Sequence, residues 1–94
     1  MSEPPRRVRA VVRGRVQQVG FRVFVLRHGD RLGLKGTVAN RPDGTLEAVV
    51  EGSPRAVDEL VRLLHDGPPA ARVERVETVE ENAAGTLPPM RITA

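Results

Sequence analysis

A loop bounded by glycines and followed by an arginine is the part of this sequence best suited to chemistry. It runs from Gly14 to Gly20, and Arg22 comes two residues later. The residues before the loop alternate as in a strand, and those after it recur with the period of a helix. The loop's backbone N–H groups and a helix N-terminus would therefore face the same place. An arginine in the first turn of that helix can donate two parallel hydrogen bonds to a phosphate, so the sequence pattern predicts an anion site at the loop.

Spacing alone leaves a second interpretation of the loop open. It lacks the Gly-Lys-Ser/Thr ending of a Walker A loop, and it does not fit the glycine pattern of a dinucleotide-binding turn. Either it cradles a phosphate, or it is an ordinary strand-to-helix connection with Arg22 at the surface. The residue types by themselves do not decide between the two.

The elements that position this loop can be predicted from the period of the apolar residues. Residues 8–12 alternate between apolar and mostly charged side chains, which indicates a strand. Apolar residues between 21 and 32 fall on one face of a helix. Extended segments at 35–40 and 45–51 flank Pro42-Asp43-Gly44, in which proline and glycine suit a tight turn. A β-hairpin is expected there.

The second half of the chain contains another helix and two further extended segments. Ser53-Pro54 is typical of an N-cap followed by proline in the first turn, and apolar residues at 57–64 give the helix that follows one apolar face. Three valines between 73 and 79 predict another strand, with an irregularity because their spacing is not two. A loop at 82–89 and a short strand at 90–93 complete the chain.

The predicted order is β-α-β-β-α-β with a short C-terminal strand. Two helices of this length cover one face of a mainly antiparallel sheet, so the expected fold class is α+β, a ferredoxin-like α/β sandwich. Residues 1–5 are expected to form a flexible tail. Residues 6–94 are expected to form a single domain, because 94 residues suffice for one domain and not for two.

Composition excludes several classes of function. There is no cysteine, so disulfides and thiolate metal sites are excluded. No apolar run approaches the length of a membrane span, and the first residues lack the apolar core of a signal peptide. We therefore expect a cytoplasmic protein without a membrane partner, a metal or a cofactor, and a monomer is the simplest assembly.

The many arginines have two interpretations. The chain has 15 Lys and Arg against 12 Asp and Glu, a net charge of +3, and five arginines gather near the N-terminus: Arg6, Arg7, Arg9, Arg13 and Arg15. They are expected to line a solvated strand face, and the alternative is a surface that attracts anions. Nucleic-acid binding is not expected. RNA-recognition domains of this fold class stack bases on aromatic residues of the central strands, whereas Phe21 and Phe24 lie outside the predicted strands.

The segment from Gly14 to Arg22 resembles the signature of the acylphosphatase family, G-x-V-Q-G-V-x-F-R. Residues 36–40 resemble the family's second block, G-[aromatic]-V-x-N, and residues 42–52 resemble its hairpin and third strand. The resemblance implies the ferredoxin-like fold and the hydrolysis of acyl phosphates to a carboxylate and inorganic phosphate. A small-molecule acyl phosphate is then the expected substrate.

The resemblance also implies roles for individual residues. Arg22 would bind the phosphoryl group and Asn40 would orient the attacking water through its side-chain amide, so both would be catalytic. Gln17 is expected to shape the loop more than to contact substrate, and Gly14 and Gly20 to set its geometry. The residues expected to surround the phosphate, largely through backbone N–H groups, are Gln17, Gln18, Val19, Gly20, Phe21 and Arg22.

Two positions depart from the family pattern. Gln18 stands where the family usually has glycine, and if this position needs a positive φ the side chain costs about 1 kcal/mol or more in strain. The outcome could be a weaker enzyme, a reshaped loop or no loss at all. Thr37 replaces an aromatic residue. A non-catalytic phosphate-binding module on the same fold is therefore the main alternative function.

Three polar residues also have purely structural interpretations. Asn40 could simply cap the hairpin turn, although the family block favours a catalytic role. His28 lies on the apolar face of the first predicted helix, where packing is expected. His65 lies at the end of the second helix, where a histidine suits the helix dipole. Neither histidine is expected to be catalytic.

Overall fold

The computed structural model describes residues 3–94, which contain five strands and two helices. The order along the chain agrees with the predicted one. The elements are β1 (Arg6–Arg15), α1 (Phe21–Arg31), β2 (Lys35–Asn40), β3 (Leu46–Gly52), α2 (Pro54–Asp66), β4 (Arg72–Glu81) and β5 (Arg91–Ile92). Within residues 3–94, no helix is long and apolar enough to cross a membrane. The tail predicted at residues 1–5 lies partly outside the described residues, and the 6–94 domain boundary stays a prediction.

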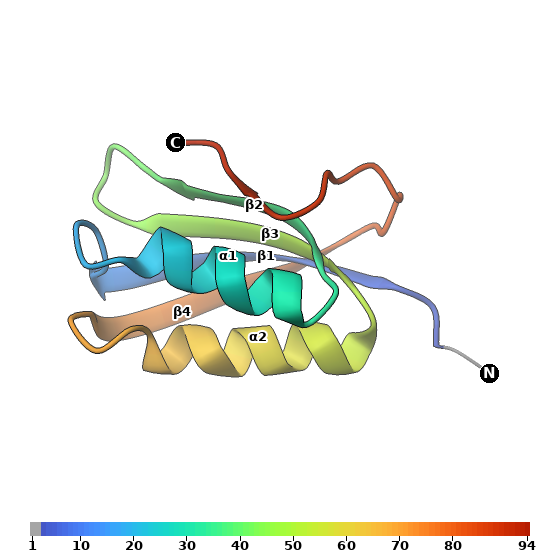
Figure 1. Ribbon diagram of the computed structural model, residues 1–94, viewed down its shortest axis with the longest axis horizontal. Helices are drawn as coiled ribbons and strands as arrows, with labels where there is room; N and C mark the ends of the chain where they lie inside the picture. Colours follow the sequence, from blue (N-terminus) through green and yellow to red (C-terminus); the bar gives the residue numbers. More distant parts are fainter. Residues whose placement is uncertain (1–2) are drawn as a thin grey trace.

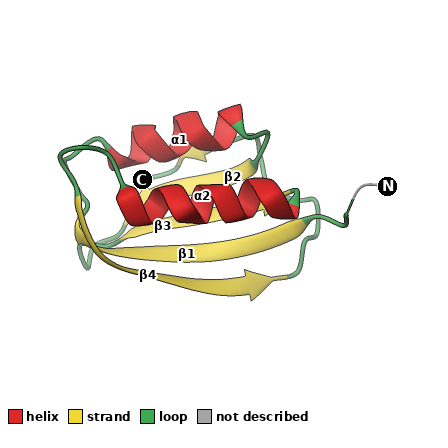
Figure 2. Ribbon diagram, turned by 90° about the horizontal axis from the view of Figure 1, so that it is seen from below, coloured by secondary structure: helices red, strands yellow, loops and turns green. Residues whose placement is uncertain are grey.

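The strands form one sheet in the order β4-β1-β3-β2-β5. Neighbouring strands are antiparallel except for β2 and β5, which are parallel. Both helices lie on the same face of this sheet, as Figures 1 and 2 show from two directions. The predicted ferredoxin-like α/β sandwich is therefore confirmed.

The core lies between this face of the sheet and the helices. Val8, Ala10 and Val12 of β1 are buried, and so are Phe21 of α1 and Leu60 of α2. Apart from Phe21, every residue in the buried cluster is Val, Leu, Ala or Met. Aliphatic side chains thus provide most of the apolar surface that holds helices and sheet together.

The turn and cap signals read from the sequence work locally as predicted. The Ser53 Oγ accepts a hydrogen bond from the N–H of Ala56 at 3.2 Å, and Pro54 occupies the first turn of α2. In the β2–β3 hairpin, the hydroxyl and the N–H of Thr45 both donate to Asp43. These hydrogen bonds lower the pKa of the Asp43 carboxyl, and the hydroxyl contributes more than the N–H. Asp43 therefore holds the hairpin turn, which is the structural role considered for Asn40.

The expected irregularity of β4 is a shift in its pairing with β1. Arg13 is opposite Arg75 and Gly14 is opposite Val73, so one residue of β4 is left over between them. The shift lets both Val73 and Val76 pack against the core, while Val79 is 61% exposed. The spacing of three between the first two valines is explained by this bulge.

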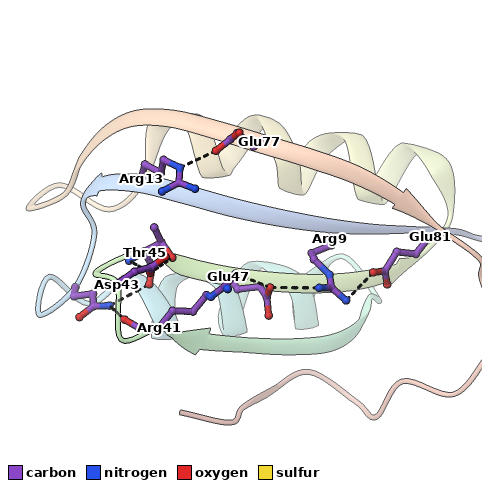
Figure 3. A network of polar contacts seen from close by, with 9 residues as sticks. Arg9, Arg13, Arg41, Asp43, Thr45, Glu47, Glu77 and Glu81 are labelled. Carbon is purple, nitrogen blue, oxygen red and sulfur yellow. Dashed lines mark hydrogen bonds and ion pairs between the residues drawn. The ribbon is translucent and has the colours of Figure 1, made fainter.

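The face of the sheet without helices carries alternating charges (Figure 3). Arg9 lies 2.8 Å from Glu81 and 3.8 Å from Glu47, and Arg13 donates to Glu77 at 2.7 Å. Arg6 and Arg7, also from the N-terminal cluster, are each paired with carboxylates as well. Four of the five arginines in the N-terminal cluster are thus paired with acids, which favours a solvated strand face over an anion-attracting surface. Exposed pairs of this kind contribute about 0–1 kcal/mol each.

One ion pair of this outer face is almost buried. Arg7 Nε donates to Glu51 at 2.8 Å, and the two side chains are 13% and 9% exposed. The loop between β4 and β5 covers them, because the N–H of Gly85 donates to Glu51 and Arg7 donates to the hydroxyl of Thr86. This loop leads into β5 and the C-terminal residues, so the ion pair helps to direct the end of the chain back along β2.

Candidate active site

The predicted phosphate loop lies between β1 and α1, but it is shorter than expected. β1 continues to Arg15, so the loop proper is residues 16–20. Gly14 belongs to the strand and does not bound the loop: a Cβ there would lie 2.2 Å from the carbonyl oxygen of Arg72. Its role is the close approach of two backbones at the bulge. Gly20 does bound the loop, with φ of +81° at the N-cap of α1.

The N-terminus of α1 has unpaired backbone donors. Gly20 supplies no side-chain cap, and Phe24 is the first residue whose N–H finds a helix-type acceptor, the carbonyl of Gly20 at 3.1 Å. The N–H groups of Phe21, Arg22 and Val23 are therefore left without an acceptor inside the helix. Such groups and the partial positive charge of a helix end are suited to binding an anion. Phe21 contributes only its backbone, because its ring is in the core.

Gln18 has φ of +61° and is the one non-glycine residue with positive φ within residues 3–94. The position thus requires the conformation that glycine adopts freely, as the departure from the family pattern suggested. The side chain is exposed and lines the cavity described below. The loop therefore stores backbone strain next to the N-terminus of α1.

Gln18→Gly should raise the free energy of unfolding by roughly 0.5–1 kcal/mol, because relief of left-handed strain exceeds the extra entropy of glycine in the unfolded chain. Urea denaturation measures the change. Gln18→Ala is the matched control, since alanine loses the side chain and keeps the strain. Equal stabilities of the glycine and alanine variants would show that the loop is not strained at this position.

Gln17 joins the loop to the β2–β3 hairpin. Its Nε2 donates to the carbonyl oxygens of Arg41 at 2.8 Å and Thr45 at 3.0 Å. Arg41 directly follows Asn40, so these two hydrogen bonds set the position of the loop relative to the end of β2. The geometry agrees with a residue that shapes the loop; whether Gln17 also contacts substrate stays a prediction.

The end of β2 brings Asn40 to the phosphate loop. Asn40 and Arg22 line the same cavity of about 200 Å³, together with loop residues Gln18 and Gly20. The remaining lining residues are Val16, Phe21, Val23 and Ile92. Two residues 18 positions apart thus meet beside the unpaired N–H groups of α1. Figure 1 shows the loop and the end of β2 at the same end of the molecule.

Asn40 also has an unsatisfied polar atom. Its Oδ1 is buried and has no hydrogen-bond partner in the described part of the chain. An unpaired buried acceptor typically costs about 1–3 kcal/mol, so such an atom marks a place where a donor is expected to bind. Because Asn40 and Arg22 line the same cavity, that donor would lie next to an anion bound at Arg22.

Sequence reasoning did not identify Ala94 as a residue of the site. The carbonyl oxygen of Ala94 accepts from Arg22 Nη1 at 2.7 Å and from the backbone N–H of Asn40 at 3.2 Å. One oxygen thus holds both predicted catalytic residues. The parallel pairing of β5 with β2 positions it, and no local motif near residue 94 indicates this contact.

The histidines lie outside this cavity. His28 packs its ring edge-on against Phe24, with centroids 4.6 Å apart, and His65 Nδ1 lies 3.0 Å from the carbonyl oxygen of Val61 in its own helix. Among residues 3–94, no group of three or more His, Asp or Glu side chains could hold a metal ion. The polar side chains that line the cavity are those of Arg22, Gln18 and Asn40, and backbone N–H groups lie beside them.

The sequence and the fold are similar to those of acylphosphatases. The family model described as Acylphosphatase matches residues 8–88. A Rubrobacter xylanophilus acylphosphatase is 58% identical over 80 residues, which are 85% of this chain and 73% of the relative. A Thermococcus kodakarensis acylphosphatase is 52% identical over 85% of this chain and 90% of its own length. The crystal structure of acylphosphatase from Bacillus subtilis superimposes with a TM-score of 0.90 at 34% identity, over 95% of this chain and 99% of that chain.

Proposed function

Because the chain belongs to the acylphosphatase family, we propose that Arg22 and Asn40 carry out the chemistry of that family here. The activity is hydrolysis of the carboxyl–phosphate bond of an acyl phosphate, which yields a carboxylate and inorganic phosphate. One observation supports the assignment most directly: Arg22 and Asn40 line one cavity with residues of the phosphate loop, and the Asn40 Oδ1 is buried without a partner in the described chain.

The phosphate of the substrate binds at the N-terminus of α1. The N–H groups of the loop and of Phe21, Arg22 and Val23 donate to its oxygens, and the Arg22 guanidinium neutralises their charge. Arg22 then exchanges its hydrogen bond to Ala94 for one to the phosphate. The backbone donors are already in place before the substrate binds, so they need little reorganisation as charge spreads in the transition state.

Asn40 holds the attacking water. Its Oδ1 accepts a hydrogen bond from the water, and the water oxygen forms a bond to phosphorus as the bond from phosphorus to the acyl oxygen breaks. The electron pair of that bond leaves with the carboxylate. A neutral amide cannot take a full proton at pH 7, so the proton of the water passes to an oxygen of the phosphate itself. The carboxylate is a good leaving group, so no stronger base is required.

We propose further that the reaction needs no metal ion. Cationic and N–H donors already face the anion at the N-terminus of α1, and they supply the charge stabilisation that a metal gives elsewhere. The non-catalytic alternative has no support among the relatives, which are named as enzymes. A cytoplasmic location and a monomeric state stay predictions from the sequence.

Hydrolysis of acetyl phosphate in the presence of a metal chelator tests the proposal. We expect saturable release of inorganic phosphate at the same rate with and without the chelator. Phosphate binding without any hydrolysis would select the non-catalytic module. Loss of activity on chelation, restored by a divalent cation, would contradict the metal-free reaction.

The kcat for acetyl phosphate should change little between about pH 5 and 8, because neither a guanidinium nor an amide titrates in this range. The measurement is the rate at saturating substrate across buffers of constant ionic strength. A steep limb near pH 6.5 would point to a histidine and contradict the assignment. His28→Gln and His65→Gln would then identify which histidine is responsible.

A further inference from the structure

A second, larger cavity lies next to the phosphate site. Its volume is about 310 Å³, against about 200 Å³ for the first, and the two share Gly20 and Val23. Its walls are one side of α1 and the loop that follows α2, including Pro68 and Pro69. Both this loop and the phosphate loop lie at the left end of the molecule in Figure 1. The second cavity is therefore a continuation of the first along α1.

The part of this groove nearest the phosphate site is apolar. Val19, Val23, Phe24 and the two prolines line it, and Val23 is 44% exposed at the boundary between the cavities. The phosphate site does not use these side chains, apart from Val23. A large exposed valine beside an anion site provides a contact for an apolar group that is attached to the anion.

The far end of the groove is cationic. Arg27 and His28 line it, one turn of α1 beyond Val23 and Phe24 and thus about 6 Å further along the helix. Arg31 Nη2 lies 3.0 Å from His28 Nδ1. Because a guanidinium can only donate, His28 Nδ1 is the acceptor and its Nε2 carries the proton. The end of the groove thus presents hydrogen-bond donors.

Arg27 is the cation that remains available there. Across residues 3–94 its side chain forms no ion pair, whereas Glu59 of α2 is paired with Arg62. Hydrogen bonding by Arg62 is the main reason that the pKa of Glu59 is lowered, and Arg31 and His28 contribute less. Glu59 is therefore paired chiefly with Arg62 of its own helix, which leaves Arg27 without an acidic partner in the described chain.

We propose that this groove binds the acyl part of the substrate, and that the preferred substrates carry a second anionic group at the far end of an apolar acyl part, where Arg27 binds it. The inference rests on the proposed phosphate site, because the groove begins at Gly20 and Val23 of that site. Either a carboxylate or a phosphate could accept a hydrogen bond from Arg27. Binding of this second anionic group would add one charge-assisted hydrogen bond to those made by the phosphate loop.

A pair of rigid substrates of similar size tests the cationic end. These are 4-carboxybenzoyl phosphate and 4-methylbenzoyl phosphate, and the quantity measured is the ratio of their kcat/KM values. Comparing this ratio between variants cancels any difference in intrinsic reactivity. Arg27→Gln should lower the ratio by about tenfold, as expected for one lost hydrogen bond between charged groups. Arg55→Gln, the same charge change at an exposed position of α2 outside both cavities, should leave the ratio unchanged.

An unchanged ratio in Arg27→Gln would overturn the anion-binding end of the groove. The apolar part has its own test, since 4-methylbenzoyl phosphate should have a lower KM than acetyl phosphate in the unaltered protein, and equal values would overturn it. Acetyl phosphate separates the two proposals. If the protein hydrolyses it but shows neither preference, the groove inference fails and the proposed function stands. If it does not hydrolyse it at all, the proposed function fails.

Discussion

Arg22→Ala should lower kcat/KM for acetyl phosphate by at least about 1,000-fold, as expected when a charged donor to the transferred phosphoryl group is lost. It should also abolish the binding of inorganic phosphate. The physical reason is that Arg22 supplies the positive charge in a cavity whose other polar groups are neutral, namely backbone N–H groups and the amides of Gln18 and Asn40. Steady-state kinetics and calorimetric titration with inorganic phosphate measure the two effects.

The stability of the Arg22→Ala variant shows whether the loss is specific. Arg22 is half-buried and its described hydrogen bond goes to the carbonyl of Ala94, so the fold should remain intact. Arg22→Lys is a useful intermediate, since lysine retains the charge and loses the paired donors. We expect partial phosphate affinity and poor turnover from it. Undiminished phosphate affinity in the alanine variant would contradict the arrangement proposed for this site.

Asn40→Ala should lower kcat for acetyl phosphate by about 100- to 1,000-fold, the range expected when the group that positions a reactant is lost. Affinity for inorganic phosphate should remain, because the amide orients water and does not supply the charge that binds the anion. Single-turnover kinetics and phosphate titration separate the two effects. The two variants thus differ in phosphate binding: Asn40→Ala should lose turnover alone, whereas Arg22→Ala should lose binding and turnover together.

The stability of Asn40→Ala discriminates further between a catalytic and a structural asparagine. The Oδ1 is buried without a partner in the described chain, so its removal should leave the free energy of unfolding unchanged or raise it. A residue that capped the hairpin would instead lose stability on truncation, typically by about 1 kcal/mol. Full activity in a folded Asn40→Ala protein would show that another group orients the water.

The sequence predicts local structure correctly where neighbouring residues determine it. The start of α2 follows from Ser53-Pro54, and the hairpin turn follows from Pro42-Asp43-Gly44, because caps and turns form among residues at most four positions apart. The anion site at Arg22 rests on the same kind of signal, since a helix N-terminus and its first-turn side chain are local features, and it stays a prediction. The boundary at Gly14 was wrong, because its glycine serves a contact with β4 that the local sequence does not reveal.

The sequence by itself therefore determined the elements, their order and a candidate phosphate loop, while the resemblance of its motifs supplied the pairing of Arg22 with Asn40. Only the tertiary structure decided that both residues line one cavity and that the carbonyl of Ala94 contacts both. The groove leading to Arg27 also exists only in the folded chain, where α1 meets the loop after α2. The physical reason is that such contacts join residues tens of positions apart. Burial of the shared core and strand pairing bring them together, and neither leaves a pattern within a few neighbouring residues.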